Sequence, residues 1–352
     1  MDQQPVPAAP LVSVVIPHWR GAALVQRCLQ SLRTTVYQPF EILLVDNGCE
    51  DGSVAATAAQ FPEIKVVASA VNLGFAGGCN LGLRASRGKY VALLNNDAVV
   101  TPNWLAPMVA AMERDDRLAA CQPKILALAP AQQFDYAGAA GGLLDWLGYP
   151  FCRGRIFFTL ETDRGQYDEA ADIFWASGAC CLLRQSVLAE TGLLDESFFA
   201  HMEEIDLNWR MHLAGYRVRA TPAAVVYHQA GSTLQTDSPR KVYLNHRNGL
   251  LLLLKHGEAA RLCAILPLRF ILDLAAALRA LFGLRPAQAA MILAAYGYLL
   301  THVPGLRQQR RESRRRRRLT AAAMQQRFYP RSIVWQYFVR RRKCFTDLPG
   351  AP

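Results

Sequence analysis

The chain has 352 residues, of which 52% are hydrophobic, and it carries a formal net charge of +11. A chain of this length can bury one large core or two. Its nine cysteines are scattered, odd in number and without a CxxC pair, which argues against a disulfide framework or a zinc site and predicts free thiols in a reducing compartment. Residues 1–10 contain neither a basic nor an apolar segment, so we expect a disordered N-terminus without a secretory signal.

The net charge divides the chain into two parts of opposite sign. Residues 1–239 hold 17 Lys+Arg and 24 Asp+Glu, a net charge of −7. Residues 240–352 hold 22 Lys+Arg and 4 Asp+Glu, a net charge of +18. We therefore expect the two parts to have different partners.

Short apolar, β-branched runs alternate with helical patterns in the first hundred residues. The predicted strands are residues 11–16, 40–45, 64–68 and 90–94. Between the first two strands, Leu24, Cys28, Leu29 and Leu32 are spaced to share one face of a helix. Strands that alternate with helices at this spacing predict βαβ units and a mostly parallel sheet.

The fourth predicted strand runs directly into three polar residues, Asn95, Asn96 and Asp97. Burying these groups unpaired is costly, so we expect them at the carboxyl end of the strand, where ligands bind in open α/β sheets. A hard oxygen ligand at that place suits a divalent cation bound together with a phosphate substrate. The alternative is an ordinary polar turn after a strand.

A glycine-rich loop, residues 72–80, leads into the helix before this strand. It lacks the G-x-G-x-x-G pattern and does not follow the first strand, which argues against a dinucleotide site. Its glycines would let the backbone approach a phosphate or a sugar closely, and a plain tight turn explains them equally well.

The pattern is less regular from residue 101 to residue 228. We expect a helix over 104–114, an irregular loop rich in glycine and aromatic residues over 134–154, and a buried segment over 173–183. A short helix follows at 186–191. The aromatic run at 198 becomes a helix that Gly215 ends, and residues 218–227 lead to His228.

Six motifs in this order resemble the inverting glycosyltransferases of family 2. They are VSVVIPHW (12–19), LLVDNGCEDGS (43–53), NLGFAGGCNLG (72–82), YVALLNNDAVV (90–100), WASGACCLLR (175–184) and FFAHMEEIDLNWR (198–210), followed by His228. The resemblance covers residues 11–235 and is nearest to bacterial rhamnosyltransferases and galactofuranosyltransferases. It implies the α/β GT-A fold of nucleotide-diphospho-sugar transferases, a mostly parallel Rossmann-like sheet, over residues 11–239.

The resemblance also assigns roles at the donor site. Asp46 would read the nucleobase, since a carboxylate accepts the N3–H of uracil or thymine; the alternative is a loop-capping role. Asp97, with Asn95 and His228, would hold Mg²⁺ or Mn²⁺ against the diphosphate, although Asn95 replaces the first Asp of the family's DxD pattern, and a lone histidine is more often structural. The nucleotide and donor residues implied are Pro17, Asp46, Asp51, Asn72, Gly74, Asn95 and Asn96.

At the acceptor side, Trp175, Ser177 and Gly178 resemble the family segment beside the acceptor sugar, and the alternative for Trp175 is core packing. Glu204 falls at the position of the catalytic carboxylate, with Glu203 as the second candidate. Asp206 stands four residues before Arg210, a good spacing for an ion pair, which leaves Glu204 freer to act as general base. The alternative for this acid cluster is capping of the helix N-terminus.

The basic second part is expected to be helical and to associate with a membrane. Residues 240–306 hold apolar helices interrupted by Arg269, Asp273 and Arg279, which fits amphipathic helices lying on a surface better than a spanning helix. Residues 288–303 are uncharged but short for a span. Arginine clusters follow within a basic tail, 307–352, and suit an anionic cytoplasmic leaflet. The alternative is a helical subdomain with a solvated basic face.

The sequence therefore predicts a metal-dependent glycosyltransferase, peripherally attached to the inner face of the cell membrane. By resemblance, the donor would be a dTDP- or UDP-sugar, with dTDP-rhamnose first, and the acceptor a lipid-linked cell-surface glycan. Two alternatives stay open: an inactive nucleotide-sugar-binding scaffold and a basic nucleic-acid-binding protein. No nucleic-acid-binding module or aromatic platform accompanies the basic patches, so we expect no nucleic-acid partner.

Overall fold

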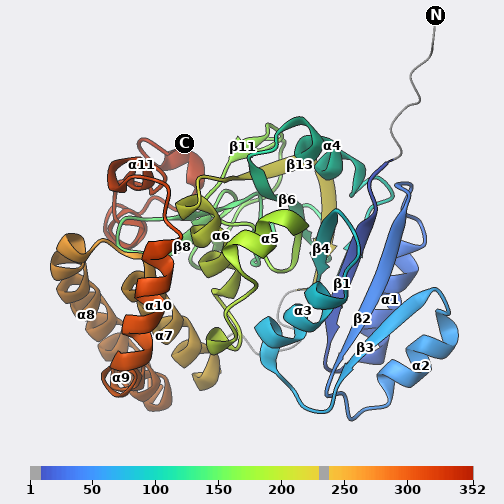
Figure 1. Cartoon of the computed structure of the whole chain (residues 1–352). Helices are drawn as coiled ribbons and strands as arrows, with labels where there is room; N and C mark the ends of the chain where they lie inside the picture. The colour runs from blue at the N-terminus through green and yellow to red at the C-terminus, as the bar shows by residue number, and fades with distance from the viewer. Residues whose placement is uncertain (1–8, 230–237, 352) are drawn as a thin grey trace, which may run out of the picture.

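A mixed nine-stranded sheet with helices on both faces organises the computed structural model, which describes residues 9–229 and 238–351 (Figure 1). The strand order is β11-β13-β6-β12-β4-β1-β2-β3, and β5 pairs with β13. The expected disordered N-terminus falls mainly on residues 1–8, which lie outside the described residues.

The first half of the sheet is parallel, as the alternating pattern predicts. The strands are β1 (Val12–His18), β2 (Phe40–Asn47), β3 (Ile64–Ser69) and β4 (Tyr90–Leu94). The crossover helices are α1 (Ala22–Leu32), α2 (Ser53–Gln60) and α3 (Gly74–Ala85). Because β1, β2 and β4 run in the same direction, their carboxyl ends meet at one edge.

The second half of the sheet is mixed and contains strands that the sequence patterns did not resolve. These are β5 (Ala98–Val100), β6 (Leu118–Ala127), β11 (Ala171–Asp172), β12 (Cys180–Arg184) and β13 (Arg217–His228). The pairing of β5 with β13 places His228 opposite Ala98. This pairing brings the end of β13 to the residues that follow β4.

Two layers of helices cover the sheet, each with its own apolar cluster. Buried residues of α1, α2 and α4 (Ala106–Arg114) form one cluster, and buried residues of α3, α5 (Gln185–Thr191) and α6 (Glu203–Leu213) form the other. A short 3₁₀ turn, η1 (Glu196–Phe198), precedes α6. The continuous apolar strands are thus buried on both faces, as expected for a doubly covered sheet.

The prediction of an irregular loop over 134–154 is wrong in part. A second, four-stranded sheet begins there, with the order β10-β9-β8-β7. Its strands are β7 (Gly142–Leu144), β8 (Pro150–Cys152), β9 (Arg155–Ile156) and β10 (Thr159–Leu160). Strands of two or three residues are too short to produce a readable alternation.

The basic second part folds against this small sheet. Its elements are α7 (Pro239–His256), α8 (Ala259–Phe282), α9 (Pro286–Thr301), α10 (Val303–Arg315), α11 (Ala321–Gln325), a π-helical turn η2 (Trp335–Val339) and a 3₁₀ turn η3 (Phe345–Asp347). Tyr329, Ile333 and Phe345, within the segment expected as a basic tail, are buried in one cluster with Phe151 of β8. Residues 303–351 are therefore part of the packed structure.

No single helix within residues 9–229 and 238–351 has both the length and the apolar composition to cross a membrane. α9 and α10 meet the length and composition criteria only when they are joined, and the pair is bent by 77°.

Candidate active site

Three polar side chains meet where β4 and β13 end. Nε2 of His228 lies 3.0 Å from Oδ1 of Asp97 and 3.2 Å from the side-chain amide nitrogen of Asn95. On the other side of the ring, Nδ1 of His228 donates to Oδ1 of Asp135 at 2.9 Å. His228, Asp97 and Asp135 are all at least nine-tenths buried. The structure thus brings together the three residues predicted as metal ligands and adds Asp135.

This centre fits a divalent cation. Oδ1 of Asp97 is buried, and its 3.0 Å contact with Nε2 of His228 does not have the geometry of a hydrogen bond. This carboxylate oxygen is therefore available to bind a cation. Burial lowers the pKa of His228, but the adjacent carboxylates of Asp135 and Asp97 outweigh burial and raise the pKa to about 10. A histidine that donates one ring N–H to a carboxylate has the orientation of metal-binding histidines. Asn95 would supply a neutral oxygen after rotation of its amide.

Next to this centre, His18 at the end of β1 connects two loops. The side-chain amide of Asn96 donates to Nδ1 of His18 at 2.8 Å, so Nε2 carries the proton and faces Oγ of Ser53 at 2.7 Å. Ser53 in turn donates to Oδ1 of Asp51 at 2.5 Å. Burial lowers the pKa of His18, against the raising effects of Asp51 and Asp46. Asn96 therefore positions the loop that carries Asp51, and we find no role for it that requires a free side chain.

The two predicted donor-site aspartates after β2 differ in how many hydrogen bonds they accept. Oδ1 of Asp46 accepts the backbone N–H of Cys49 at 2.9 Å, which is the loop-capping role, and the carboxylate is half-buried. Asp51 accepts from Ser53 and from the backbone N–H of Gly21 at 2.9 Å, and these bonds lower its pKa to about 2. Asp51 thus orders the loop.

One further group of potential ligand atoms lies here. His18, Cys49 and Asp51 each place one such atom within 4.8 Å of the others, and no other group of this kind occurs among the residues that the structure describes. Burial and the neighbouring Asp46 raise the pKa of the Cys49 thiol to about 12, and a protonated thiol is a poor metal ligand. The cluster therefore gives no reason to revise the expectation that the cysteines hold no zinc.

The glycine-rich loop is fixed by its own side chains. Oδ1 of Asn72 accepts the backbone N–H of Gly74 at 2.8 Å, and Asn47 bonds the backbone of Leu73 and Gly74. Gly74 has φ +74°, and a Cβ there would lie 2.5 Å from the carbonyl oxygen of Phe199. The close approach of Phe199 thus requires a glycine at position 74. The sequence had suggested a phosphate or a sugar as the group that approaches this loop. Pro17 lies opposite Val45 in the pairing of β1 with β2, one residue before that pairing ends at His18 and Asp46.

The segment before α6 has a strained backbone. Phe199, His201 and Met202 have φ of 62°, 69° and 70°, values that non-glycine residues rarely adopt. The carbonyl of Phe199 accepts from Phe75 at 2.7 Å, and the Asn248 amide of α7 donates to the carbonyls of Ala200 and His201. Backbone strain held in place from both sides is concentrated at functional sites. No sequence signal marks it, because none of these residues is glycine.

The strained segment leads to two acids at the start of α6, each with one carboxylate oxygen that has no hydrogen bond. Oε2 of Glu203 and Oε2 of Glu204 are buried without a partner, and Glu203 is almost fully buried. Burial raises the pKa of Glu204 to about 7, against the lowering effect of backbone N–H groups at the helix start. Burial and the neighbouring Glu204 raise the pKa of Glu203 well above its usual range. Both acids are therefore harder to ionise than an exposed glutamate.

Asp206 has the structural role that its spacing predicts. Its Oδ2 accepts from Arg210 at 2.9 Å, and its Oδ1 accepts from Lys255 at 2.5 Å and His256 at 2.8 Å. Burial raises the pKa of Asp206, but Lys255, Arg210 and His256 outweigh it and hold the pKa well below its usual range. Asp206 is thus committed to binding α6 to α7.

The acceptor candidates lie in a segment that joins the two halves of the site. Ala179 accepts the backbone N–H of Asn95 at 2.9 Å, and a Cβ at Gly178 would lie 3.0 Å from the ring of Phe75. Oγ of Ser177 donates to the carbonyl of Ala137 at 2.7 Å. Trp175 is only 4% exposed, and its indole N–H donates to Leu143. The indole therefore offers no open face for a sugar ring in this structure, and packing is the role that its contacts support.

Comparisons with known proteins bear on the family and the fold. The profile described as Glycosyl transferase family 2 matches residues 13–192. N-acetylglucosaminyl-diphospho-decaprenol L-rhamnosyltransferase of Mycobacterium tuberculosis is 27% identical over 243 residues, which cover 65% of this chain and 79% of the relative.

Two solved structures share the fold. GalNAc-T7 with UDP, GalNAc and Mn²⁺ aligns with a TM-score of 0.54 and 17% identity over 71% of this chain and 48% of its own. The mannosyltransferase PcManGT of Pyrobaculum calidifontis, in complex with GDP-Man and Mn²⁺, aligns with a TM-score of 0.51 and 16% identity over 88% of this chain and 86% of its own. At these identities the likeness establishes the fold alone, in agreement with the expected GT-A fold.

Proposed function

The chain belongs to glycosyl transferase family 2 and is a glycosyltransferase, and from that premise we propose that it transfers L-rhamnose from dTDP-rhamnose to a lipid-linked glycan, with inversion at the anomeric carbon. The observation that carries this proposal is the meeting of Asp97 Oδ1 and His228 Nε2, 3.0 Å apart, beside the base-reading candidate Asp46. The name of the mycobacterial relative supports rhamnose as the sugar, with another dTDP- or UDP-sugar as the alternative donor.

On the donor side, each residue has a separate task. The Asp46 carboxylate accepts the N3–H of thymine or uracil. Asp97 and His228, with Asn95, would hold Mg²⁺ or Mn²⁺, and the buried Asp97 oxygen without a hydrogen bond is what supports this set. The bound ion would neutralise charge on the departing diphosphate. Asp135 keeps the His228 ring in place by accepting its Nδ1–H.

The chemical step requires one base. The acceptor hydroxyl oxygen attacks the anomeric carbon from the face opposite the diphosphate, so the new C–O bond forms as the bond to the phosphate oxygen breaks. The nucleoside diphosphate leaves with the electron pair of that bond, and the hydroxyl proton passes to the Glu204 carboxylate. A carboxylate with a pKa near 7 is well matched to this task at neutral pH.

The acceptor and the place of action follow from the same relative and from the charge division. The relative's name describes a polyprenyl-diphosphate-linked sugar, which supports a lipid-linked acceptor here. A second part with a net charge of +18 suits an anionic leaflet, so we place the enzyme peripherally at the inner face of the cell membrane.

A transfer assay tests the proposal. Purified enzyme is given dTDP-rhamnose, UDP-galactose or UDP-N-acetylglucosamine with a synthetic polyprenyl-diphosphate N-acetylglucosamine in detergent, and the glycolipid product is followed. We expect transfer from dTDP-rhamnose, its loss with EDTA, and its return with Mn²⁺ or Mg²⁺. Transfer from a UDP-sugar alone would contradict rhamnose as the sugar. Donor binding without transfer or hydrolysis of any donor would favour the inactive scaffold.

A further inference from the structure

The helix α8 has its polar and apolar faces reversed. Its buried positions include Arg269 and Asp273, which are 3% and 1% exposed. Its solvent side carries large apolar residues that are 40–89% exposed, continuing one residue beyond the helix to Leu284. We call these the α8 stripe: Leu268, Phe270, Ile271, Leu274, Leu278, Leu281, Phe282 and Leu284. The expected amphipathic helix is present, but Arg269 and Asp273 point inward, whereas Arg279 is exposed.

Contacts of the two buried charges fix the helix in this rotation. Asp273 accepts from the hydroxyl of Tyr296 on α9 at 2.7 Å and lies 3.2 Å from Nδ1 of His246 on α7. The guanidinium of Arg269 lies 3.7 Å over the ring of Tyr149 and donates to the carbonyl of Leu147 at 3.3 Å. Turning the helix to bury the α8 stripe would break these contacts and leave the polar groups that Arg269 and Asp273 contact unpaired, which is costly.

A second exposed apolar group continues the α8 stripe. Trp335, Phe338 and Val339 of η2 are 47–53% exposed. The ring of Phe338 lies 5.2 Å from that of Phe157, whose neighbour Phe158 is 70% exposed and lies 5.9 Å from the guanidinium of Arg279 on α8. Figure 1 places α8 and the C-terminal segment on the same side of the molecule, away from β1, β2 and β3. An exposed apolar area of this extent marks an interaction surface.

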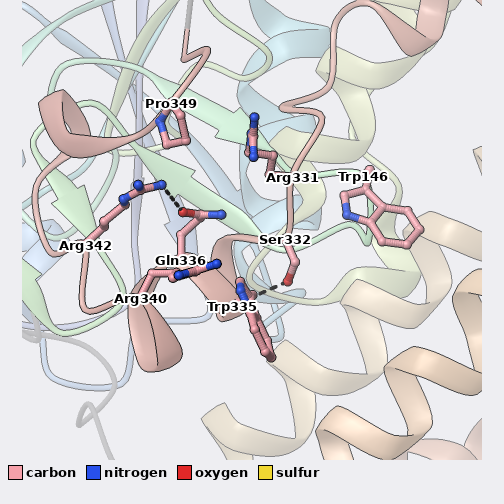
Figure 2. Close-up of a pocket in the computed structure, with 8 residues that line it drawn as sticks. All are labelled: Trp146, Arg331, Ser332, Trp335, Gln336, Arg340, Arg342 and Pro349. Atoms are coloured by element: carbon pink, nitrogen blue, oxygen red, sulfur yellow. Dashed lines mark hydrogen bonds between the residues drawn. The ribbon is translucent and has the colours of Figure 1, made fainter.

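Beside η2 lies a basic cavity of about 600 Å³. Arg331, Arg340 and Arg342 line it together with Trp146 and Trp335, and no acidic side chain is found among its described lining residues. Figure 2 shows Arg340 and Arg342 on one side of the cavity and Trp146 on the other, with Arg331 between them. Arg342 uses one N–H to bond Gln336 at 2.7 Å and keeps others for a ligand. Arginine forks suit phosphate oxygens, and indole rings suit the boundary between lipid and water.

From these observations we propose that this face binds an anionic phospholipid bilayer, with the α8 stripe and η2 in the acyl boundary and the arginine cavity around a lipid phosphate. Charge complementarity decides the occupant. A second copy of this chain would bring two sets of arginines together, whereas an anionic leaflet neutralises them. The inference rests on the proposed function in one respect only: a lipid-linked acceptor in the bilayer would reach the enzyme at this face.

Vesicle sedimentation tests the proposal. Full-length protein is spun with vesicles of phosphatidylglycerol and phosphatidylcholine, and with vesicles of phosphatidylcholine alone. We expect binding to the mixed vesicles that high salt reduces but does not remove, because salt screens the arginines and leaves apolar insertion intact.

Two variants with matched controls assign the surface. Ile271→Glu should lower vesicle affinity more than about tenfold, the effect of losing one inserted aliphatic side chain, while Val36→Glu, which changes an even more exposed but remote residue, should not. Arg340→Gln should lower affinity about fivefold, the value of one basic residue at such a surface, while Lys65→Gln on β3 should not. Equal binding of Ile271→Glu and the wild type would overturn the proposal.

Two further measurements distinguish a bilayer from the other possible ligands of this face, a second copy of the chain and a free phosphate. A wild-type dimer in light scattering without vesicles that Ile271→Glu makes monomeric would assign the stripe to a second copy, against the proposal. Binding of glycerol phosphate without any vesicle binding would leave a free-phosphate site only, also against it. Transfer to the lipid-linked acceptor in detergent is measured on the same variants. If transfer persists and vesicle binding is absent, this inference fails and the proposed function stands. If vesicle binding persists and transfer is absent, the proposed function fails and this inference stands.

Discussion

Two regions of this protein bury a histidine against a carboxylate, and they meet its charge in opposite ways. At the strand ends, His228 lies between Asp97 and Asp135, so two carboxylates share one ring. Between α6, α7 and α10, Asp206 is contacted by Arg210 and Lys255 as well as by His256.

The charges explain what each region does. Burial lowers the pKa of His256 despite Asp206, and the neutral ring donates to Asp206 and accepts from Ser313 at 2.7 Å, which ties three helices together. His228 instead has its pKa raised to about 10, and Asp97 keeps an oxygen without a hydrogen bond. A region with balanced charge stabilises the fold, whereas a region with surplus negative charge is suited to take a cation. Glu203 and Glu204 likewise each keep one carboxylate oxygen without a hydrogen bond.

The largest effect should come from Glu204→Gln, which removes a base and keeps its shape. We expect the transfer rate to fall by roughly two to four orders of magnitude while donor affinity persists. Steady-state transfer and calorimetric donor binding measure the two quantities. Glu203→Gln is the matched control on the same turn and should keep most of the transfer rate. If Glu203→Gln loses transfer and Glu204→Gln keeps it, the base is Glu203.

The stability of Glu204→Gln separates the base from a helix cap. The pKa of an unfolded glutamate is about 4.3, and burial raises that of Glu204 to about 7 in the fold. The protonated carboxyl thus adds stability that is fully present below the unfolded pKa and is lost as the pH rises through about 7. Above that pH the variant should melt no lower than the wild type. Loss of a cap would instead lower its melting temperature.

Asp206→Asn should cause the largest loss of folding stability. It leaves Arg210 buried without its ion-pair partner and Lys255 paired with Asp195 alone, and breaking a buried pair costs about 3–5 kcal/mol. Urea unfolding at neutral pH measures this cost. Asp168→Asn is the control: Lys124 keeps its pair with Asp163, and Asp168 itself is 62% exposed, so that loss should stay within about 1 kcal/mol. A similar loss of unfolding free energy in both variants would contradict the claim that the ion pairs of Asp206 stabilise the fold more than a partly exposed pair does.

A smaller effect is expected from Asp135→Asn, which changes a residue that touches the proposed ion only through His228. The affinity for Mn²⁺ in the presence of dTDP should fall about 10–100-fold, the usual value of such a partner. Titration calorimetry gives the affinity, and an unperturbed melting temperature would show that the fold is intact. An unchanged affinity would mean that His228 is held without Asp135.

The sequence predicted the parallel half of the sheet well, because each strand is a continuous apolar run that stops at a polar residue. The observed β1 and β4 begin or end within two residues of the predicted ranges. The ion pair of Asp206 and Arg210 was also predictable, since both residues lie on one helix. These features depend on local spacing alone.

Features made by distant contacts could not be predicted from local patterns. Asp135 stands 93 residues before its partner His228, within a segment expected to be an irregular loop. The rotation of α8 depends on Tyr149 and Tyr296, so Arg269 and Asp273, two of the charges that sequence reasoning placed on its surface, are buried. His18 was within reach, because it is a polar residue at the end of a predicted strand, as Asp46 and Asn95 are.

The most direct test concerns Asp97, the buried carboxylate whose oxygen lacks a hydrogen bond. Calorimetry of dTDP and UDP binding, with and without Mn²⁺, is compared for the wild type, Asp97→Asn and Asp46→Asn. We expect Mn²⁺ to strengthen nucleotide binding in the wild type, to have no effect in Asp97→Asn, and to keep its effect in Asp46→Asn, whose affinity is lower throughout. An unchanged Mn²⁺ enhancement in a folded Asp97→Asn variant would contradict the cation centre at the ends of β4 and β13.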